Sequence, residues 1–161
     1  MAFARRLIRA LGGGRSVLPQ VAEILKQPDR NWSCNPPARE DDILRLIESC
    51  QVKLPDEYLA LLRFSNGGEG DLALPPLLFV LFDVDEVLKT WSDSFYREEF
   101  PHFLFFGGNG GLEQIAFDLK RGEPYPIVMI DPIAGLESAM EIAPNMAHFI
   151  EAIGLEYADE S

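Results

Sequence analysis

The stretch 54-LPDEYLALLRFSNGGEGD-71 joins a helical pattern to a run of three glycines, and its interpretation decides the fold. Pro55 suits the first turn of a helix, because the N–H that proline lacks has no partner there. Two acids follow it and favour the positive end of the helix dipole. Asn66 and Gly67 tolerate the left-handed backbone angles that the end of a helix requires. The stretch therefore predicts a helix that ends in a glycine turn.

The same glycines raise the alternative of a phosphate-binding loop, because residues 68–73 fit the pattern G-x-G-x-x-A. The dinucleotide fingerprint requires a strand before these glycines and a helix after them, whereas here the predicted helix comes first. Glu69 and Asp71 would also repel a pyrophosphate. A second run, GGNGG at 107–111, lies between two extended segments, where Asn and Gly are typical of a hairpin turn. We therefore expect no bound cofactor at either run.

Charge limits the kinds of partner that the chain can bind. Its 161 residues include 26 acids and 14 Lys or Arg, a formal net charge of −12. Such a protein repels phosphates, so we expect a basic protein as partner, and no nucleic acid or anionic membrane. No apolar stretch approaches the ~20 residues of a membrane span. Two cysteines, Cys34 and Cys50, suit neither a zinc site nor a disulfide scaffold, and they fit a reducing cytoplasm.

The first residues differ from the rest in charge. Residues 1–22 contain no acid and four arginines, Arg5, Arg6, Arg9 and Arg15. They predict a basic N-terminal arm or helix at 1–15, ahead of a single domain at 16–161.

Periodicity predicts that this domain has an α+β fold. Helical spacing of apolar residues recurs at 17–27, 42–50, 84–91 and 146–153. Short segments typical of strands lie at 77–82, 102–106, 113–118, 125–130 and 136–142. The connections between the last four are too short to hold crossover helices, so these strands should form an antiparallel meander. We expect a mainly antiparallel sheet of about five strands, with N-terminal helices, a C-terminal helix, and helices covering one face.

One segment, TWSDSFYREEF at 90–100, combines aromatic and acidic side chains. Aromatic residues dominate the hot spots of protein interfaces, and acids steer basic partners toward them. The alternative is that two or three of these rings belong to the core. The segment predicts a protein-binding surface whose candidate residues are Trp91, Asp93, Phe95, Tyr96, Glu98 and Glu99.

The sequence offers no recognisable catalytic or metal-binding pattern. No serine lies in G-x-S-x-G, and the two histidines, His102 and His148, lack the spacing of metal ligands. Cys50 falls on the apolar face of a predicted helix, as a buried small hydrophobe does. We expect no catalytic residue, cofactor or metal. A hydrolase that uses an unrecognised pair among the 26 acids stays as a minor alternative.

With the helix, its glycine end and the meander in place, the chain resembles the SUKH superfamily. This superfamily includes the fungal cell-wall-synthesis regulator and many bacterial immunity proteins. The resemblance rests on ILRLIESCQVKLPDEYLALLRFSNGGEG at 43–70 and continues more weakly to about residue 155. The matching positions, which we interpret as structural, are Glu48, Leu54, Pro55, Tyr58, Asn66, Gly67, Gly68, Gly107 and Asp118.

The resemblance implies an α+β domain that has no catalytic residues and works by binding protein. In bacteria, such domains look like antidotes that occupy a toxin, commonly a nuclease. An acidic surface agrees with this, because a nuclease site built for nucleic acid is basic. The resulting hypothesis is a cytoplasmic protein that neutralises a basic toxin domain. The alternative is an intracellular regulatory or scaffold domain without a toxin partner.

Overall fold

The computed structural model describes residues 17–158, so the basic arm predicted at 1–15 lies outside the described residues. In the described part of the chain, seven strands form one antiparallel sheet in which each strand pairs with the next in sequence. Their bounds are β1 Trp32–Cys34, β2 Gly68–Asp71, β3 Leu78–Leu81, β4 Phe103–Gly108, β5 Gln114–Asp118, β6 Ile127–Ile130 and β7 Met140–Ala143.

Helices occupy the ends of this chain segment and two of the connections between strands. Between residues 17 and 158 they are α2 Val17–Leu25, α3 Glu40–Cys50, α4 Asp56–Phe64, α5 Val84–Ser92, α6 Ser94–Glu99 and α7 Met146–Ala152. Two short 3-10 turns, η1 Leu119–Arg121 and η2 Leu136–Ser138, follow β5 and precede β7.

The predicted α+β class is confirmed, and strands β3–β7 correspond to the five predicted strands. The expected number of strands is too low, because β1 and β2 were missed. Strand β1 has only three residues, and β2 is the sequence Gly-Glu-Gly-Asp, whose composition is typical of a turn. Its neighbours β1 and β3 hold β2 in the sheet by pairing with it on both sides.

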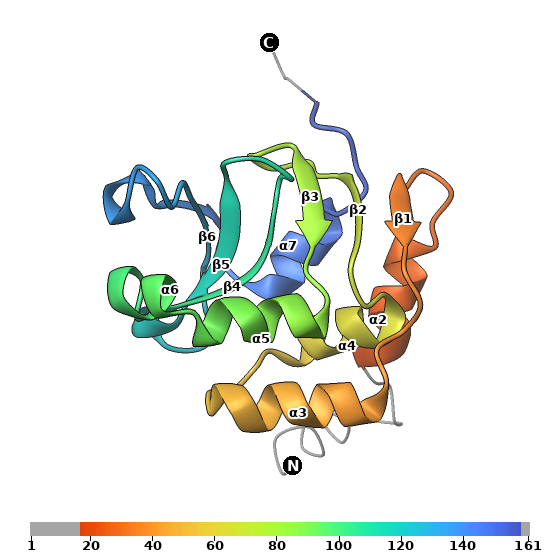
Figure 1. Ribbon diagram of the computed structural model, residues 1–161. Coiled ribbons are helices and arrows are strands. Elements are labelled where there is room, and N and C mark those ends of the chain that lie inside the picture. Colours follow the sequence, from red (N-terminus) through yellow and green to blue (C-terminus); the bar gives the residue numbers. More distant parts are fainter. Residues whose placement is uncertain (1–16, 159–161) are drawn as a thin grey trace.

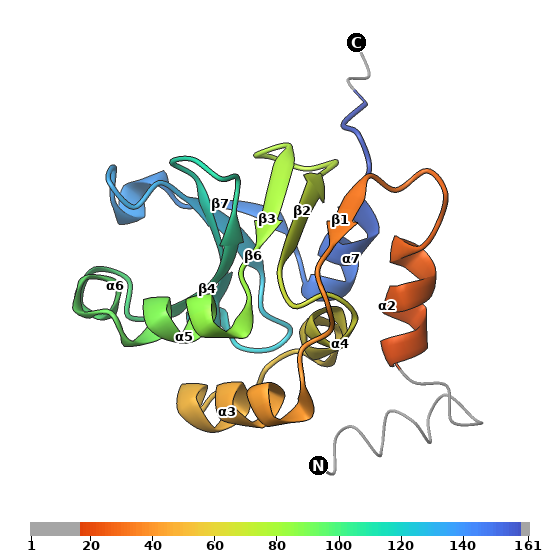
Figure 2. The same ribbon diagram turned by 45° about the vertical axis from the view of Figure 1, so that its right-hand side comes forward.

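The strand order sorts the connections into two groups. Helices α3 and α4 lie between β1 and β2, and α5 and α6 lie between β3 and β4. Figures 1 and 2 show α3, α4 and α5 gathered at one end of the strands, with the hairpin turns at the other end. Because antiparallel strands reverse direction at each turn, the three connections at 72–77, 109–113 and 131–139 all lie at the same end of the strands.

Alternation along the strands builds one apolar cluster on each face of the sheet. The larger cluster joins the sheet to α4 and α7, and its stacked rings Phe106 and Phe117 have centroids 4.3 Å apart. The smaller cluster, on the opposite face, consists of Phe100, Phe105, Ala116, Val128 and Ile130. Tyr96 of α6 packs against the smaller cluster. Helices therefore cover most of one face, as expected, and α6 also covers part of the other.

Two side chains fix the start of α5. The carboxylate of Asp83 accepts a hydrogen bond from the backbone N–H of Glu86 (2.8 Å), and the Glu86 carboxylate accepts one from the N–H of Asp83 (3.2 Å). This reciprocal arrangement is a capping box. Asn66, which follows α4, accepts from the N–H of Val84 (3.0 Å). The glycine turn is thereby attached directly to the next helix of the fold.

We expect Asp83→Ala to lower the free energy of unfolding by about 1 kcal/mol, because a helix N–H loses its partner. Chemical denaturation measures the change. The matched control is Asp85→Ala, which removes an exposed carboxylate of the same helix that forms a surface ion pair with Arg45. Surface pairs contribute little, so this control should change stability by less than about 0.5 kcal/mol. Equal losses in the two variants would contradict the capping role.

Candidate functional site: a hollow beside helix α6

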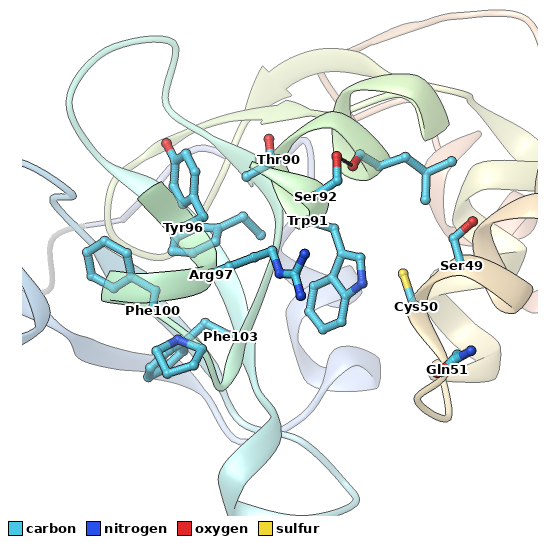
Figure 3. A pocket seen from close by; sticks show the side chains of 13 residues that line it. Ser49, Cys50, Gln51, Thr90, Trp91, Ser92, Tyr96, Arg97, Phe100 and Phe103 are labelled. Atoms are coloured by element: carbon cyan, nitrogen blue, oxygen red, sulfur yellow. Dashed lines mark hydrogen bonds between the residues drawn. The ribbon is translucent and has the colours of Figure 1, made fainter. Parts of the chain in front are cut away.

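The sequence-predicted binding segment forms the end of α5 and the whole of α6. Asp93 joins the two helices, and its carboxylate caps α6 by accepting from the N–H of Phe95 (2.9 Å). Beside them lies a hollow of about 710 Å³, which we call the α6 hollow. The end of α3, both α5 and α6, and the start of β4 line it (Figure 3). The structure thus places the segment at a concave surface.

The aromatic side chains of the segment divide between surface and interior. Phe100 is buried in the smaller apolar cluster, which agrees with the core alternative for that ring. Trp91 and Tyr96 are half-buried and line the α6 hollow. Phe95 is 47% exposed, although its ring centroid lies 5.3 Å from that of Tyr96. Phe95 is therefore an apolar side chain held at the surface by neighbouring rings.

The three acids of the candidate surface lie on the outside of this region. Asp93, Glu98 and Glu99 are exposed, and none of them forms an ion pair with another residue in the range 17–158. Arg97, which sequence reasoning did not single out, points toward Trp91 within the hollow (Figure 3). Within residues 90–100, the acids therefore point outward, and Arg97, the one cation of this segment, lines the hollow.

Some side chains that line the α6 hollow are of types that can act as catalytic nucleophiles. Cys50 lies at its wall, and burial raises the pKa of this thiol to about 11. A thiol is therefore the dominant form at neutral pH, and a thiol is a poor nucleophile. Ser49 and Ser92 also line the hollow, and neither histidine does. Within residues 17–158, no three His, Cys, Asp or Glu side chains lie close enough together to hold a metal ion.

A second hollow, of about 450 Å³, lies where α4 begins, and sequence reasoning did not predict it. Its wall includes Pro55 and Asp56, together with an ion pair between Lys53 and Glu123 (3.2 Å). Burial raises the pKa of Asp56; the nearby Lys53 opposes this effect and Glu123 adds to it. The second hollow joins parts of the chain that are far apart in sequence, so no local pattern signals it.

The residues that match the SUKH pattern are mostly buried or hold the backbone in place. Leu54 and Tyr58 are buried against the larger cluster, and Pro55 precedes the first residue of α4. Gly107 lies where the β4–β5 register shifts, and a Cβ added there would come within 2.6 Å of the Val80 carbonyl oxygen. The Asp118 carboxylate caps the turn η1. Glu48 differs from these, because it is exposed on α3.

The glycine stretch shapes the backbone. Gly67 and Gly68 have φ of 97° and 121°, values that residues with a side chain rarely adopt. The segment that fits G-x-G-x-x-A begins with strand β2, whereas the dinucleotide fingerprint continues from its glycines into a helix. Gly68 is also required because it pairs with the neighbouring strand β1 at close range: a Cβ on Gly68 would lie 2.6 Å from the Ser33 carbonyl oxygen.

Fold and site together define an α+β domain that presents an aromatic and acidic surface beside a hollow. The family model described as the SMI1/KNR4 family (SUKH-1) matches residues 37–152, and the chain belongs to this family. The resemblance to the SUKH superfamily is thereby confirmed. A comparison with curated protein sequences found no match. None of the helices between residues 17 and 158 has the length and apolar character that crossing a membrane requires.

Proposed function

We propose that this protein is a non-catalytic, cytoplasmic binding protein that neutralises a cognate toxin, a basic nuclease domain, by direct contact. Membership of the SUKH-1 family supports a binding domain of this kind. The net charge of −12 favours a basic protein as partner over nucleic acid. The observation that carries the proposal furthest is the exposed Phe95 ring, beside the exposed acids Asp93, Glu98 and Glu99, which form no ion pair within residues 17–158.

The surface around α6 would act in two ways. The exposed ring of Phe95 and the half-buried rings of Trp91 and Tyr96 would provide the apolar anchor, because buried aromatics dominate binding energy. The acids would raise the association rate by attracting a basic face. Occupation of a nuclease site by this surface would exclude nucleic acid from it, which requires no chemical step in the binding protein.

The test uses the protein encoded next to this chain's gene, purified and assayed for cleavage of DNA and RNA. The proposal predicts that an equimolar amount of the chain abolishes cleavage and that its expression rescues growth. A nuclease that retains full activity in the mixture would overturn the proposal. Absence of any neighbouring toxin gene would favour the regulatory or scaffold alternative.

We expect Glu98→Lys combined with Glu99→Lys to slow association with that nuclease by roughly tenfold at low salt, because the steering charge is reversed. Stopped-flow measurements of the association rate at several salt concentrations measure the effect. The matched control is Glu23→Lys with Asp29→Lys, which changes the net charge equally at exposed positions near α2. If the two double variants slow association equally, the total charge of the chain, and not the position of the acids on α6, determines the association rate.

A further inference from the structure

The surface formed by α6 and its flanking residues, 93–100, which we call the α6 surface, is too small to hold a protein partner alone. A specific protein interface engages roughly 20–30 residues on each side. Helix α6 with its flanking residues spans only 93–100. A partner that binds here must therefore also contact neighbouring parts of the chain.

The hydrogen bonding of Tyr96 identifies the adjoining part. The Tyr96 hydroxyl and the Gln114 side-chain carbonyl oxygen are 2.9 Å apart in a hydrogen bond that Tyr96 donates. Gln114 opens β5 directly after the β4–β5 turn, and it pairs with Ile130, the last residue before the β6–β7 connection. Helix α6 is thus bonded to the residue that follows the turn 109–113, and the strand partner of that residue directly precedes the connection 131–139.

These two turns expose large apolar side chains. We call residues 109–113 together with 131–140 the hairpin surface. Ile133 is 84% exposed, the highest value among the exposed large apolar residues described. The others on this surface, each exposed by 45–61%, are Leu112, Leu136 and Met140. Residues 93–100, 109–113 and 131–140 together number 23, which lies within the size that a protein interface needs.

Hydrogen bonds inside the turns hold this surface in shape. The Asn109 side-chain oxygen accepts from the N–H groups of Gly111 (2.8 Å) and Glu113 (3.2 Å). The Ser138 hydroxyl accepts from the N–H of Asp131 (2.9 Å) and donates to the carbonyl oxygen of Gly135 (2.7 Å). A surface that is already ordered loses less entropy when it binds, so these exposed side chains suit recognition.

Charge decides which occupant fits. The hairpin surface contains Glu113, Asp131 and Glu137 and no Lys or Arg. A second copy of this acidic chain would bring like charges together, and anionic lipid or nucleic acid would be repelled. A folded protein with a basic rim and apolar side chains at its centre is complementary to it.

We infer that the hairpin surface and the α6 surface form one continuous interface, and that the hairpin surface provides most of its apolar contact with a basic protein partner. The inference rests on the proposed function for the partner's identity. It adds the contact face, with Ile133 and Leu136 as the principal apolar contacts. The Tyr96–Gln114 hydrogen bond fixes the two parts of the interface relative to each other.

The test measures the dissociation constant of the full chain for the catalytically inactivated protein encoded by the neighbouring gene. Ile133→Ser and Leu136→Ser should each weaken binding about tenfold or more. The matched control is Leu44→Ser on α3, whose side chain is 54% exposed, close to the 52% of Leu136. All three variants should keep the thermal midpoint of the unaltered chain, because the replaced side chains are exposed.

The outcomes separate this inference from the proposed function. If Phe95→Ala weakens binding while Leu136→Ser matches the Leu44→Ser control, the inference is wrong and the proposed function survives. If the unaltered chain does not bind that protein, both are wrong. If sedimentation shows dimers that Leu136→Ser dissociates, the hairpin surface joins two copies, and the inference is overturned in favour of self-association.

Discussion

Replacement of Tyr58 by Ala should lower the free energy of unfolding by about 4 kcal/mol, the largest effect that we expect from a single substitution. Tyr58 is 0% exposed, and its ring centroid lies 5.5 Å from that of Phe106 and 5.3 Å from that of Phe117. These rings join α4 to the middle of the sheet. Removing the Tyr58 ring therefore opens a cavity at the centre of the larger apolar cluster, which close-packed neighbours fill only in part.

The hydroxyl of Tyr58 leads to a contrasting expectation for Tyr58→Phe. This hydroxyl is buried, and no group within residues 17–158 forms a hydrogen bond with it. A buried polar group without a partner costs about 1–3 kcal/mol. Tyr58→Phe should therefore retain the stability of the unaltered chain or raise it by about 1 kcal/mol. A loss as large as that of Tyr58→Ala would show that the hydroxyl, and not the ring, carries the stabilisation.

The pH dependence of stability gives a second measurement of the same residue. Burial raises the pKa of Tyr58, with a smaller contribution from nearby Cys50. The folded chain therefore keeps Tyr58 neutral where the unfolded chain ionises it, and stability falls as the pH rises above about 10. Tyr58→Phe lacks this loss. Urea denaturation of both proteins at pH 7 and pH 10.5 should show that the advantage of the Phe variant increases with pH.

The second large effect is expected at Gly68, where Ala should lower the free energy of unfolding by about 3 kcal/mol. Two costs combine there. The φ of 121° strains any residue that has a Cβ, and the added Cβ would lie 2.8 Å from the Trp32 ring as well as close to β1 backbone. Backbone strain costs about 1–3 kcal/mol, and overpacking costs a similar amount. Chemical denaturation measures the sum.

Two further glycines separate the costs. Gly135 has a φ of 97° and open space around its position, so Gly135→Ala tests backbone strain alone and should cost about 1 kcal/mol. Gly70 has no positive φ, but a Cβ there would collide with the carbonyl oxygen of Asn31, so Gly70→Ala tests the collision alone. If Gly68→Ala costs no more than Gly135→Ala, the close approach of β1 has no energetic consequence.

The elements that sequence reasoning predicted are those whose signal is local. The apolar spacing at 42–50 and 84–91 depends only on neighbouring residues, and the corresponding helices α3 and α5 are both present. Strand β2 was missed because its Gly-Glu-Gly-Asp sequence has no strand preference of its own. Its place in the sheet comes from β1 and β3, which flank it from distant parts of the chain. Tertiary pairing thus overrides local propensity at this position.

The candidate site was predicted as a segment, and its three-dimensional setting was not. The aromatic and acidic composition of residues 90–100 indicated a binding segment, and the structure places this segment beside a hollow. Arg97 and the wall contributed by the end of α3 were not foreseen, because the hollow forms only when α3, α5 and β4 meet. The exposed side chains of Leu112 and Ile133 gave no signal either, since an apolar residue in a turn does not reveal whether it is buried.

The connections at the two ends of the strands differ, and this difference has an evolutionary consequence. At one end of the strands, two of the connections contain helices that complete the core, whereas at the other end the turns at 109–113 and 131–139 are held mainly by their own hydrogen bonds. Mutations and insertions in those turns leave the core undisturbed. Descendants of one ancestral scaffold are therefore free to vary the sequence and length of these two turns without refolding.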